Sequence, residues 1–155
     1  MNLTKDISLE QCVKSDYAIR HGIDNTPDKD QINNLQYLAD KILQPLRNHY
    51  GNDIFFNSVY RCKQINDAAG STDTSLHLIG CAADIDSNGI SLMELLSTIY
   101  NYMPFTELIA EYIPTGWIHA GIILGRENDR KLKLKDKDNN YRQVSLDFIL
   151  SLYGE

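Results

Sequence analysis

The feature that most constrains the fold is a pair of short apolar runs in the second half of the chain, FTELIAEY at 105–112 and GWIHAGI at 116–122. Both runs have the length and residue types of β-strands, and turn residues separate them. A connection this short joins neighbouring antiparallel strands. The run KLKLKDKDNNYRQVS at 131–145 alternates like a hairpin that turns at 138–140. This half of the chain therefore predicts a mainly antiparallel sheet.

Helical spacing is clearest in the first third of the chain. Residues 25–51 start with Thr26 as the expected N-cap and Pro27 in the first turn, and apolar residues then recur at helical spacing. Pro45 lies inside this helix and should kink or break it, because an internal proline removes a hydrogen bond and clashes with the preceding turn.

Other segments complete the expected outline. Two short helices begin at capping boxes, Ser8 with Gln11 and Ser91 with Glu94, a third runs over 63–70, and the last runs from Ser145 toward Gly154. Further strands are expected at 53–61 and 82–86. Helices at both ends around hairpin-linked strands predict an α+β fold, a mainly antiparallel sheet flanked by helices. The absence of linkers and repeats predicts a single domain, 1–155.

Charge and cysteine content narrow the class of partner. A formal net charge of −6 argues against a protein that neutralises nucleic-acid phosphates. The sequence has no signal-peptide pattern at its N-terminus and no apolar run long enough to cross a bilayer. Three cysteines at no metal-finger spacing favour reduced thiols. We therefore expect a monomer made in the cytoplasm, without a nucleic-acid or membrane partner.

Three side chains are candidate metal ligands. The stretch TSLHLIGCAADID at 74–86 places His77 and Asp84 on either side of small or apolar residues, and His119 lies in the GWIHAGI strand. A catalytic zinc ion takes three protein ligands and keeps one position open for water. We therefore predict a zinc site, although a lone buried histidine is more often a hydrogen-bonded core residue. Cys81 is interpreted as a small buried hydrophobe rather than a ligand.

Glu111 and Arg61 are the candidate catalytic side chains. Antiparallel pairing across the predicted turn could bring Glu111 near His119, within reach of the attacking water as a general base. Arg61 could hold a substrate carboxylate or stabilise the oxyanion. The competing interpretation of Glu111 is a solvated strand carboxylate like Glu107. The competing interpretation of Arg61 is a structural ion pair with a partner such as Asp86.

These motifs resemble those of a known family. SVYRCKQINDAAGSTDTSLHLIGCAADID at 58–86 is similar to the SGYRs…N…GG…SxHxxGxAaDi stretch of the zinc D-Ala-D-Ala carboxypeptidases, and WIHAGI resembles their WxH strand. The resemblance also includes DNTP…NLQYLADKILQPLR and extends over roughly residues 20–123. It implies the fold that these peptidoglycan peptidases share with hedgehog proteins.

The resemblance also implies roles for the residues that match the family's motifs. They are the Zn²⁺ ligands His77, Asp84 and His119, the base Glu111, the oxyanion or substrate anchor Arg61, and the pocket residues Tyr60 and Ser75. Some relatives place the base three residues before the last histidine, where this chain has Gly116. Val59 and Ser71 stand where glycines are common.

Two further features have alternative interpretations. Trp117 is expected to pack beside the site, and stacking against a substrate sugar is the compatible alternative. The lysines at 131, 133 and 135 are interpreted as one solvated strand face, which could also contact anionic cell-wall polymers.

The expected function is zinc-dependent hydrolysis of a peptide bond in peptidoglycan stem peptides, next to a D-amino acid. The resemblance to endolysins implies a phage lysis enzyme that another factor releases onto the cell wall, with a bacterial enzyme as the alternative. Two other classes remain open at this point. One is a non-catalytic wall-binding or virion structural module, and the other is a metallopeptidase for a free dipeptide.

Overall fold

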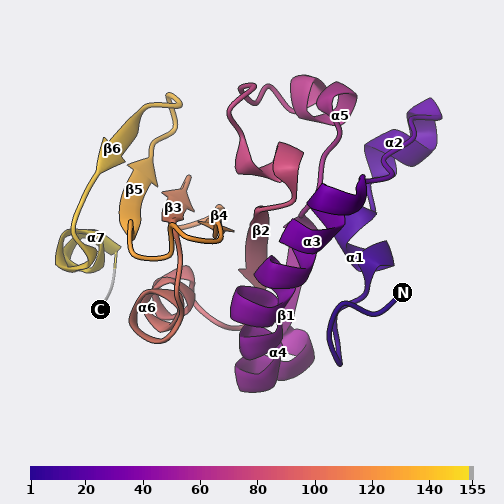
Figure 1. The fold of residues 1–155 in the computed structure, drawn as a ribbon. Helices are drawn as coiled ribbons and strands as arrows, with labels where there is room; N and C mark the ends of the chain where they lie inside the picture. The colour runs from indigo at the N-terminus through magenta and orange to yellow at the C-terminus, as the bar shows by residue number, and fades with distance from the viewer. Residues whose placement is uncertain (154–155) are drawn as a thin grey trace.

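A computed structural model describes residues 1–153 and places a six-stranded sheet among helices (Figure 1). The α-helices are α1 Leu9–Val13, α2 Asp16–His21, α3 Lys29–Leu38, α4 Gln44–Tyr50, α5 Lys63–Ala68, α6 Leu92–Tyr102 and α7 Leu146–Tyr153. The strands are β1 Ile54–Ser58, β2 Ala82–Ser87, β3 Glu107–Glu111, β4 Trp117–Gly121, β5 Lys131–Lys135 and β6 Tyr141–Gln143. The predicted last helix is confirmed up to Tyr153, and Gly154 lies outside the described residues.

The sheet has the strand order β1-β2-β4-β3-β5-β6. The predicted strand pair is β3 with β4, the predicted hairpin is β5 with β6, and both pairs are antiparallel. β1 with β2 and β2 with β4 are also antiparallel, whereas β3 pairs with β5 in parallel. The predicted α+β fold with a mainly antiparallel sheet is confirmed.

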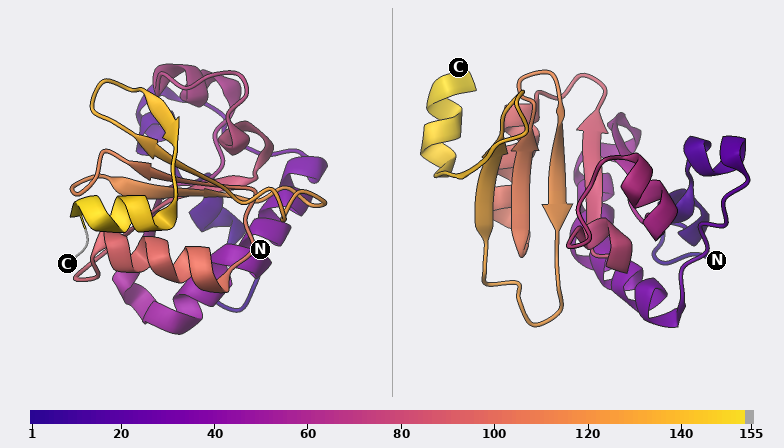
Figure 2. Two further views of the ribbon diagram at one scale, coloured as in Figure 1. Left: turned by 90° about the vertical axis from the view of Figure 1, so that its left-hand side faces the viewer. Right: turned by 90° about the horizontal axis from the view of Figure 1, so that it is seen from above.

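Side chains alternate between the two faces of the sheet, as strand geometry requires. One face contributes apolar residues to the core, among them Ala83, Ile85, Leu108, Ala110, Ile118, Ala120 and Leu132. Helices α6 and α7 lie along this face (Figure 2). Along each strand, the residues that alternate with these apolar ones point to the opposite face of the sheet. Helix α5 and the loop after it lie on that face. This alternation places Asp84, Glu111 and His119 together on the open face of the sheet.

The long helical segment begins two residues later than predicted. Asp28 is the N-cap of α3, and it forms a capping box in which its side chain accepts from the backbone N–H of Gln31 while Gln31 accepts from the N–H of Asp28, both at 2.8 Å. Thr26 is therefore not the N-cap, because this reciprocal pair satisfies two helix-terminal donors at once.

Pro45 interrupts the helix as predicted. A π-helical turn, Ala39–Leu43, separates α3 from α4, and Pro45 lies in the first turn of α4. The helical backbone continues through this point, because Leu43 and Gln44 keep right-handed helical dihedrals and the Gln44 N–H bonds to the Ala39 carbonyl oxygen; the π-helical turn accommodates the residue that lacks an N–H. The three pieces still form one rod, visible in Figure 1.

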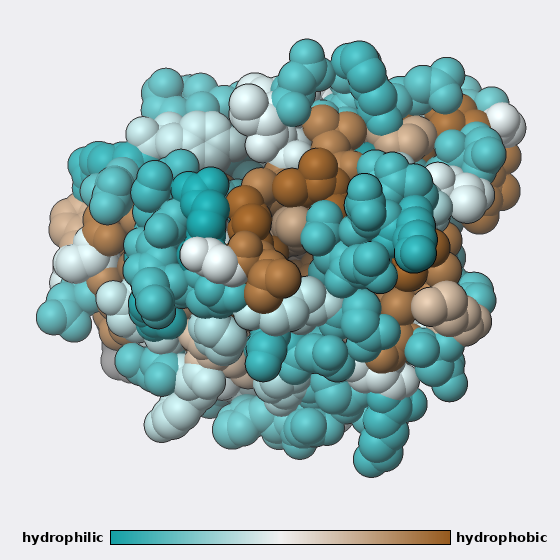
Figure 3. All heavy atoms as spheres, viewed as in Figure 1, coloured by the Kyte–Doolittle hydropathy of each residue, from teal (hydrophilic) through white to brown (hydrophobic). Residues whose placement is uncertain are grey.

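The face of the molecule that Figure 3 shows is mostly polar. Figure 3 shows one face on which polar side chains surround a small apolar area. Among residues 1–153, no helix combines the length and apolar character that crossing a bilayer requires.

The three cysteines are free, and their environments differ. Burial raises the pKa of Cys12 to about 12 and that of Cys81 to about 11, whereas Cys62 is partly exposed. Because the thiolate is the reactive form, we expect a thiol reagent at pH 8 to modify Cys62 first in the folded protein. All three should react in denaturant. Rapid modification of Cys12 or Cys81 in the folded protein, measured by peptide mass spectrometry, would contradict this burial.

Candidate metal centre

A cleft of about 790 Å³ lies on the open face of the sheet, a size that suits a short peptide. The loop between α5 and β2 forms one wall, and the β5–β6 hairpin contributes to the other. His77, Asp84 and His119 lie at its base and are buried, with exposed fractions of 1, 8 and 6%. The cleft therefore joins three buried metal-binding side chains to solvent.

Local structure fixes the position of His77. It belongs to a 3₁₀ turn, Leu76–Ile79, whose N-cap Ser75 accepts from the His77 backbone N–H at 3.3 Å. Gly80 ends the turn in the left-handed conformation, at φ 77°. A Cβ at this position would lie 2.7 Å from the carbonyl oxygen of Gln31, so the close approach of α3 also requires glycine.

Strand pairing brings Asp84 and His119 together. The two residues are direct partners in the antiparallel pair of β2 with β4, and both point to the open face. Directly opposed side chains in such a pair lie within contact distance. Asp84 and His119 are therefore neighbours in space although they lie far apart in the sequence.

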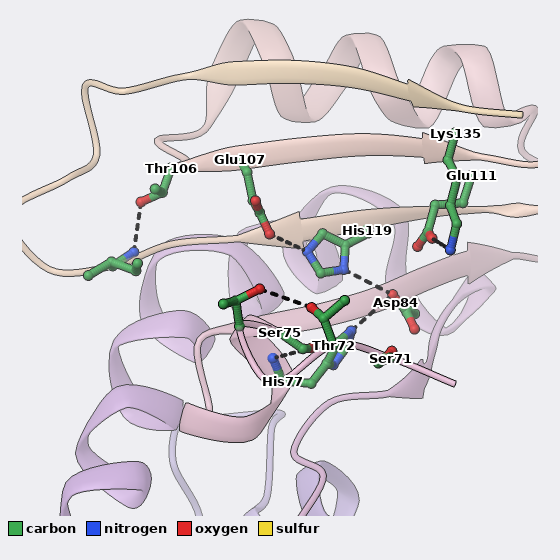
Figure 4. Close-up of polar contacts among 12 residues, drawn as sticks. Ser71, Thr72, Ser75, His77, Asp84, Thr106, Glu107, Glu111, His119 and Lys135 are labelled. Carbon is green, nitrogen blue, oxygen red and sulfur yellow. Dashed lines mark hydrogen bonds and ion pairs between the residues drawn. The ribbon is translucent and has the colours of Figure 1, made fainter. Parts of the chain in front are cut away.

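The three side chains converge on a common point (Figure 4). Asp84 Oδ1 lies 3.2 Å from His77 Nε2 and 3.3 Å from His119 Nδ1. Zinc–ligand bonds of about 2.0–2.1 Å in a tetrahedron place neighbouring ligand atoms about 3.3–3.4 Å apart. These two separations, with all three ligand atoms within 4.8 Å of one another and one carboxylate and two imidazole donors, are compatible with a zinc ion.

The outer nitrogen of each imidazole has its own partner. His77 Nδ1 lies 2.6 Å from the Val59 carbonyl oxygen, and His119 Nε2 lies 2.8 Å from Glu107 Oε1. In the neutral rings these nitrogens carry the hydrogen and donate it, which leaves His77 Nε2 and His119 Nδ1 as acceptors. Such contacts orient imidazole ligands and set their tautomers.

The sequence interpretation of Glu107 as a solvated carboxylate is wrong. Its side chain is 23% exposed and contacts His119. The signal was present in the sequence, because Glu107 lies four residues before Glu111 and strand alternation puts both on one face.

The electrostatics of the site favour a cation between the carboxylates. Burial alone would lower the pKa of His119, but hydrogen bonds with Asp84 and Glu107 outweigh it and raise this pKa to about 9. Burial works against ionisation of Asp84, yet the two imidazoles hold its pKa well below the usual range. Burial lowers the pKa of His77. The carboxylates therefore stabilise positive charge at this point, whether a proton or a metal ion carries it.

We expect Glu107→Gln to weaken zinc binding by about 10–100-fold, because the partner that orients His119 loses its charge. The affinity can be measured by competition with a chromogenic chelator. An unchanged zinc affinity would show that Glu107 does not support the ligand.

Glu111 lies in the same cleft, near the end of β3. It pairs directly with Trp117, whose Nε1 donates to Glu111 Oε2 at 2.8 Å, and its other oxygen lies 3.3 Å from Lys135 Nζ. Each carboxylate oxygen has a second lone pair, so the group can still accept from water. The structure thus places Glu111 in the cleft, as pairing across the turn predicted.

The structure also explains why position 116 carries no acidic residue. A Cβ on Gly116 would lie 1.8 Å from the backbone oxygen of Glu111, a distance that no side chain tolerates. The turn between β3 and β4 therefore excludes a base at this position.

Arg61 and Ser71 line the cleft on the side of the α5 loop. Arg61 Nη2 lies 3.5 Å from Ser71 Oγ, and its buried Nε has no hydrogen-bond partner in the described part of the chain. Burial lowers the pKa of Arg61, and the charges of Asp84 and Glu111 oppose this shift. Within residues 1–153 Arg61 has no ion pair, so the alternative of a structural pair with Asp86 finds no support.

The remaining expected site residues divide between the cleft and the core. Ser75 and Trp117 line the cleft, whereas Tyr60 does not. Tyr60 is 5% exposed, packs in the core and lines a second, smaller pocket, so its expected role in substrate binding stays a prediction.

Two of the three lysines on β5 are also part of the cleft. Lys133 and Lys135 line it, whereas Lys131 is exposed and does not. The interpretation of all three as a solvated face is therefore wrong for Lys135, whose side chain is 17% exposed, and Lys133 is partly buried. Cys81 is buried outside the metal-binding group, as the sequence interpretation had it.

The fold, with His77, Asp84 and His119 grouped on a mainly antiparallel sheet, is compatible with a metallopeptidase, and the family comparison gives the same class. The Peptidase M15 family model matches residues 5–121, and the chain belongs to this zinc-dependent family. No curated protein matches the chain. The resemblance inferred from the motifs is thereby confirmed, and residues 122–155 lie outside the matched range.

Proposed function

We propose that this metallopeptidase hydrolyses a peptide bond in peptidoglycan stem peptides, next to a D-amino acid. The observation that carries the proposal is the convergence of His77, Asp84 and His119 at the base of an open cleft, in a chain of the M15 family. These three residues would hold zinc.

The protein side chains have separate roles in the proposed reaction. A bound zinc ion would polarise the substrate carbonyl and lower the pKa of the attacking water. Glu111 takes a proton from that water and passes it to the leaving amine. Arg61 supplies charge-assisted hydrogen bonds to the carbonyl oxygen as negative charge develops, or to a substrate carboxylate.

The charge of the cleft supports an anionic substrate. With both histidines neutral, as zinc ligands are, the charged residues that line it are the cations Arg61, Lys133 and Lys135 and the carboxylates Asp84, Glu107 and Glu111, so three positive and three negative charges cancel. A zinc ion would add two positive charges, in a protein whose formal net charge is −6. A local positive potential attracts carboxylates such as those of stem peptides.

Mass spectrometry of purified peptidoglycan fragments, incubated with the protein in the presence and absence of a chelator, tests the proposal. We expect zinc-dependent cleavage, and the fragment masses identify the bond and separate a carboxypeptidase from an endopeptidase. Intact fragments with the zinc-loaded protein would reject peptidoglycan hydrolysis.

A further inference from the structure

The β5–β6 hairpin lies beyond residue 121, where the family match ends, yet it reaches the candidate base. Lys135 on β5 pairs in register with Glu111 on β3, and its Nζ lies 3.3 Å from Glu111 Oε1 (Figure 4). A segment outside the family match therefore contacts the carboxylate on which the proposed reaction depends.

Glu111 is held from two directions. Its Oε2 accepts from Trp117 on β4, and its Oε1 pairs with Lys135 on β5. These strands flank β3 on opposite sides. A carboxylate with one contact can rotate about its last bond, whereas two contacts from opposite sides fix its plane.

Lys135 is itself well ordered by its surroundings. Its side chain is 17% exposed, and its ammonium lies 5.1 Å from the ring centroids of both Tyr112 and Tyr141. The backbone oxygen of Lys135 accepts from the Tyr112 N–H at 3.0 Å. Partly buried charges interact more strongly than solvated ones. This contact is therefore stronger than a surface ion pair, which contributes little.

The charge of Lys135 is also maintained. Burial would lower its pKa, but the neighbouring Tyr141 and Tyr112 and the charge of Glu111 outweigh burial and raise it. The ammonium is thus available to Glu111 at any pH at which a peptidase of this kind works.

We propose that Lys135 is a positioning residue that, with Trp117, holds the Glu111 carboxylate in the orientation for proton transfer, so that the C-terminal hairpin completes the active site. This inference deepens the proposed function and depends on Glu111 as its base.

The geometric half of the proposal can be tested without activity. Trp117 is the only tryptophan, so the indole N–H of ¹⁵N-labelled protein gives one assignable NMR signal. We expect Lys135→Met to shift this signal and speed its hydrogen exchange, because Glu111 becomes free to move. Lys135→Arg should largely restore both, and Lys131→Met, the control on the same face of β5, should change neither. An unchanged indole signal in Lys135→Met would overturn the proposal.

The kinetic half uses the zinc-loaded protein. We expect Lys135→Met to lower kcat by about 100-fold with little change in KM, because a misplaced base affects the chemical step. Lys135→Arg should recover most of kcat, and Lys131→Met should match the wild type. A fall in kcat in Lys131→Met as large as that in Lys135→Met, or no fall in Lys135→Met, would overturn the proposal. If the wild-type protein cleaves no muropeptide, the proposed function fails, and the indole signal still decides whether Lys135 positions Glu111.

Discussion

Glu111→Gln is expected to lower kcat for muropeptide cleavage by about 10²–10⁴-fold, the range for loss of a general base. The amide oxygen can still accept from Trp117 Nε1, so the local fold should persist. Zinc content should also remain at the wild-type level, because Glu111 is not one of the three grouped ligand residues. Turnover by mass spectrometry and bound zinc by atomic emission measure the two expectations on the same preparation.

Glu94→Gln is the matched control, since Glu94 is an exposed carboxylate on α6 and should tolerate the change. Full activity in Glu111→Gln would remove Glu111 from the mechanism. If the wild type binds cell walls in a sedimentation assay but cleaves nothing, the protein is a binding module that keeps the fold and not the chemistry.

Asp84→Asn is expected to weaken zinc binding by more than about 100-fold and to abolish cleavage. Loss of an outer partner of a ligand already costs about 10–100-fold in affinity, and loss of the only carboxylate ligand should cost more. The stabilisation that zinc gives the folded protein should disappear as well. For the wild type this is about 2.7 kcal/mol when free zinc is 100 times Kd.

Zinc titration with thermal unfolding as the readout measures this effect. We expect added zinc to raise the Tm of the wild type and to leave the Tm of Asp84→Asn unchanged. Asp86→Asn is the control, because Asp86 lies two residues further along β2 on the same face and is outside the metal-binding group. A wild-type response to zinc in Asp84→Asn would exclude Asp84 as a ligand.

Motif spacing and strand alternation indicated each proposed ligand separately, although the pairing of β2 with β4 that brings Asp84 to His119 is not local in sequence. His77 is fixed by a turn that ends at Gly80, and strand alternation alone puts His119 on the face opposite Ile118. The short turn between β3 and β4 predicted that Glu111 lies on the strand beside His119, and the structure has it in the cleft. Patterns of this kind involve near neighbours in sequence, and residue spacing describes them well.

The rest of the site depends on relations that residue spacing does not describe. Lys135 reaches Glu111 through the parallel pairing of β3 with β5, which no hairpin connects. Tyr60 lies outside the main cleft, and its match to a family motif gave a position in the chain but no side-chain direction. Strand alternation could have placed Glu107 on the same face as Glu111. In the sequence, however, it resembles an ordinary surface carboxylate, and only the structure shows its contact with His119.

Anomalous diffraction at the zinc absorption edge from crystals grown with zinc tests the central claim most directly. We predict one strong anomalous peak, at about 2.0–2.2 Å from His77 Nε2, Asp84 Oδ1 and His119 Nδ1. Zinc bound elsewhere on the chain, with these three atoms contacting only one another, would contradict the proposed metal centre and the hydrolytic function that depends on it.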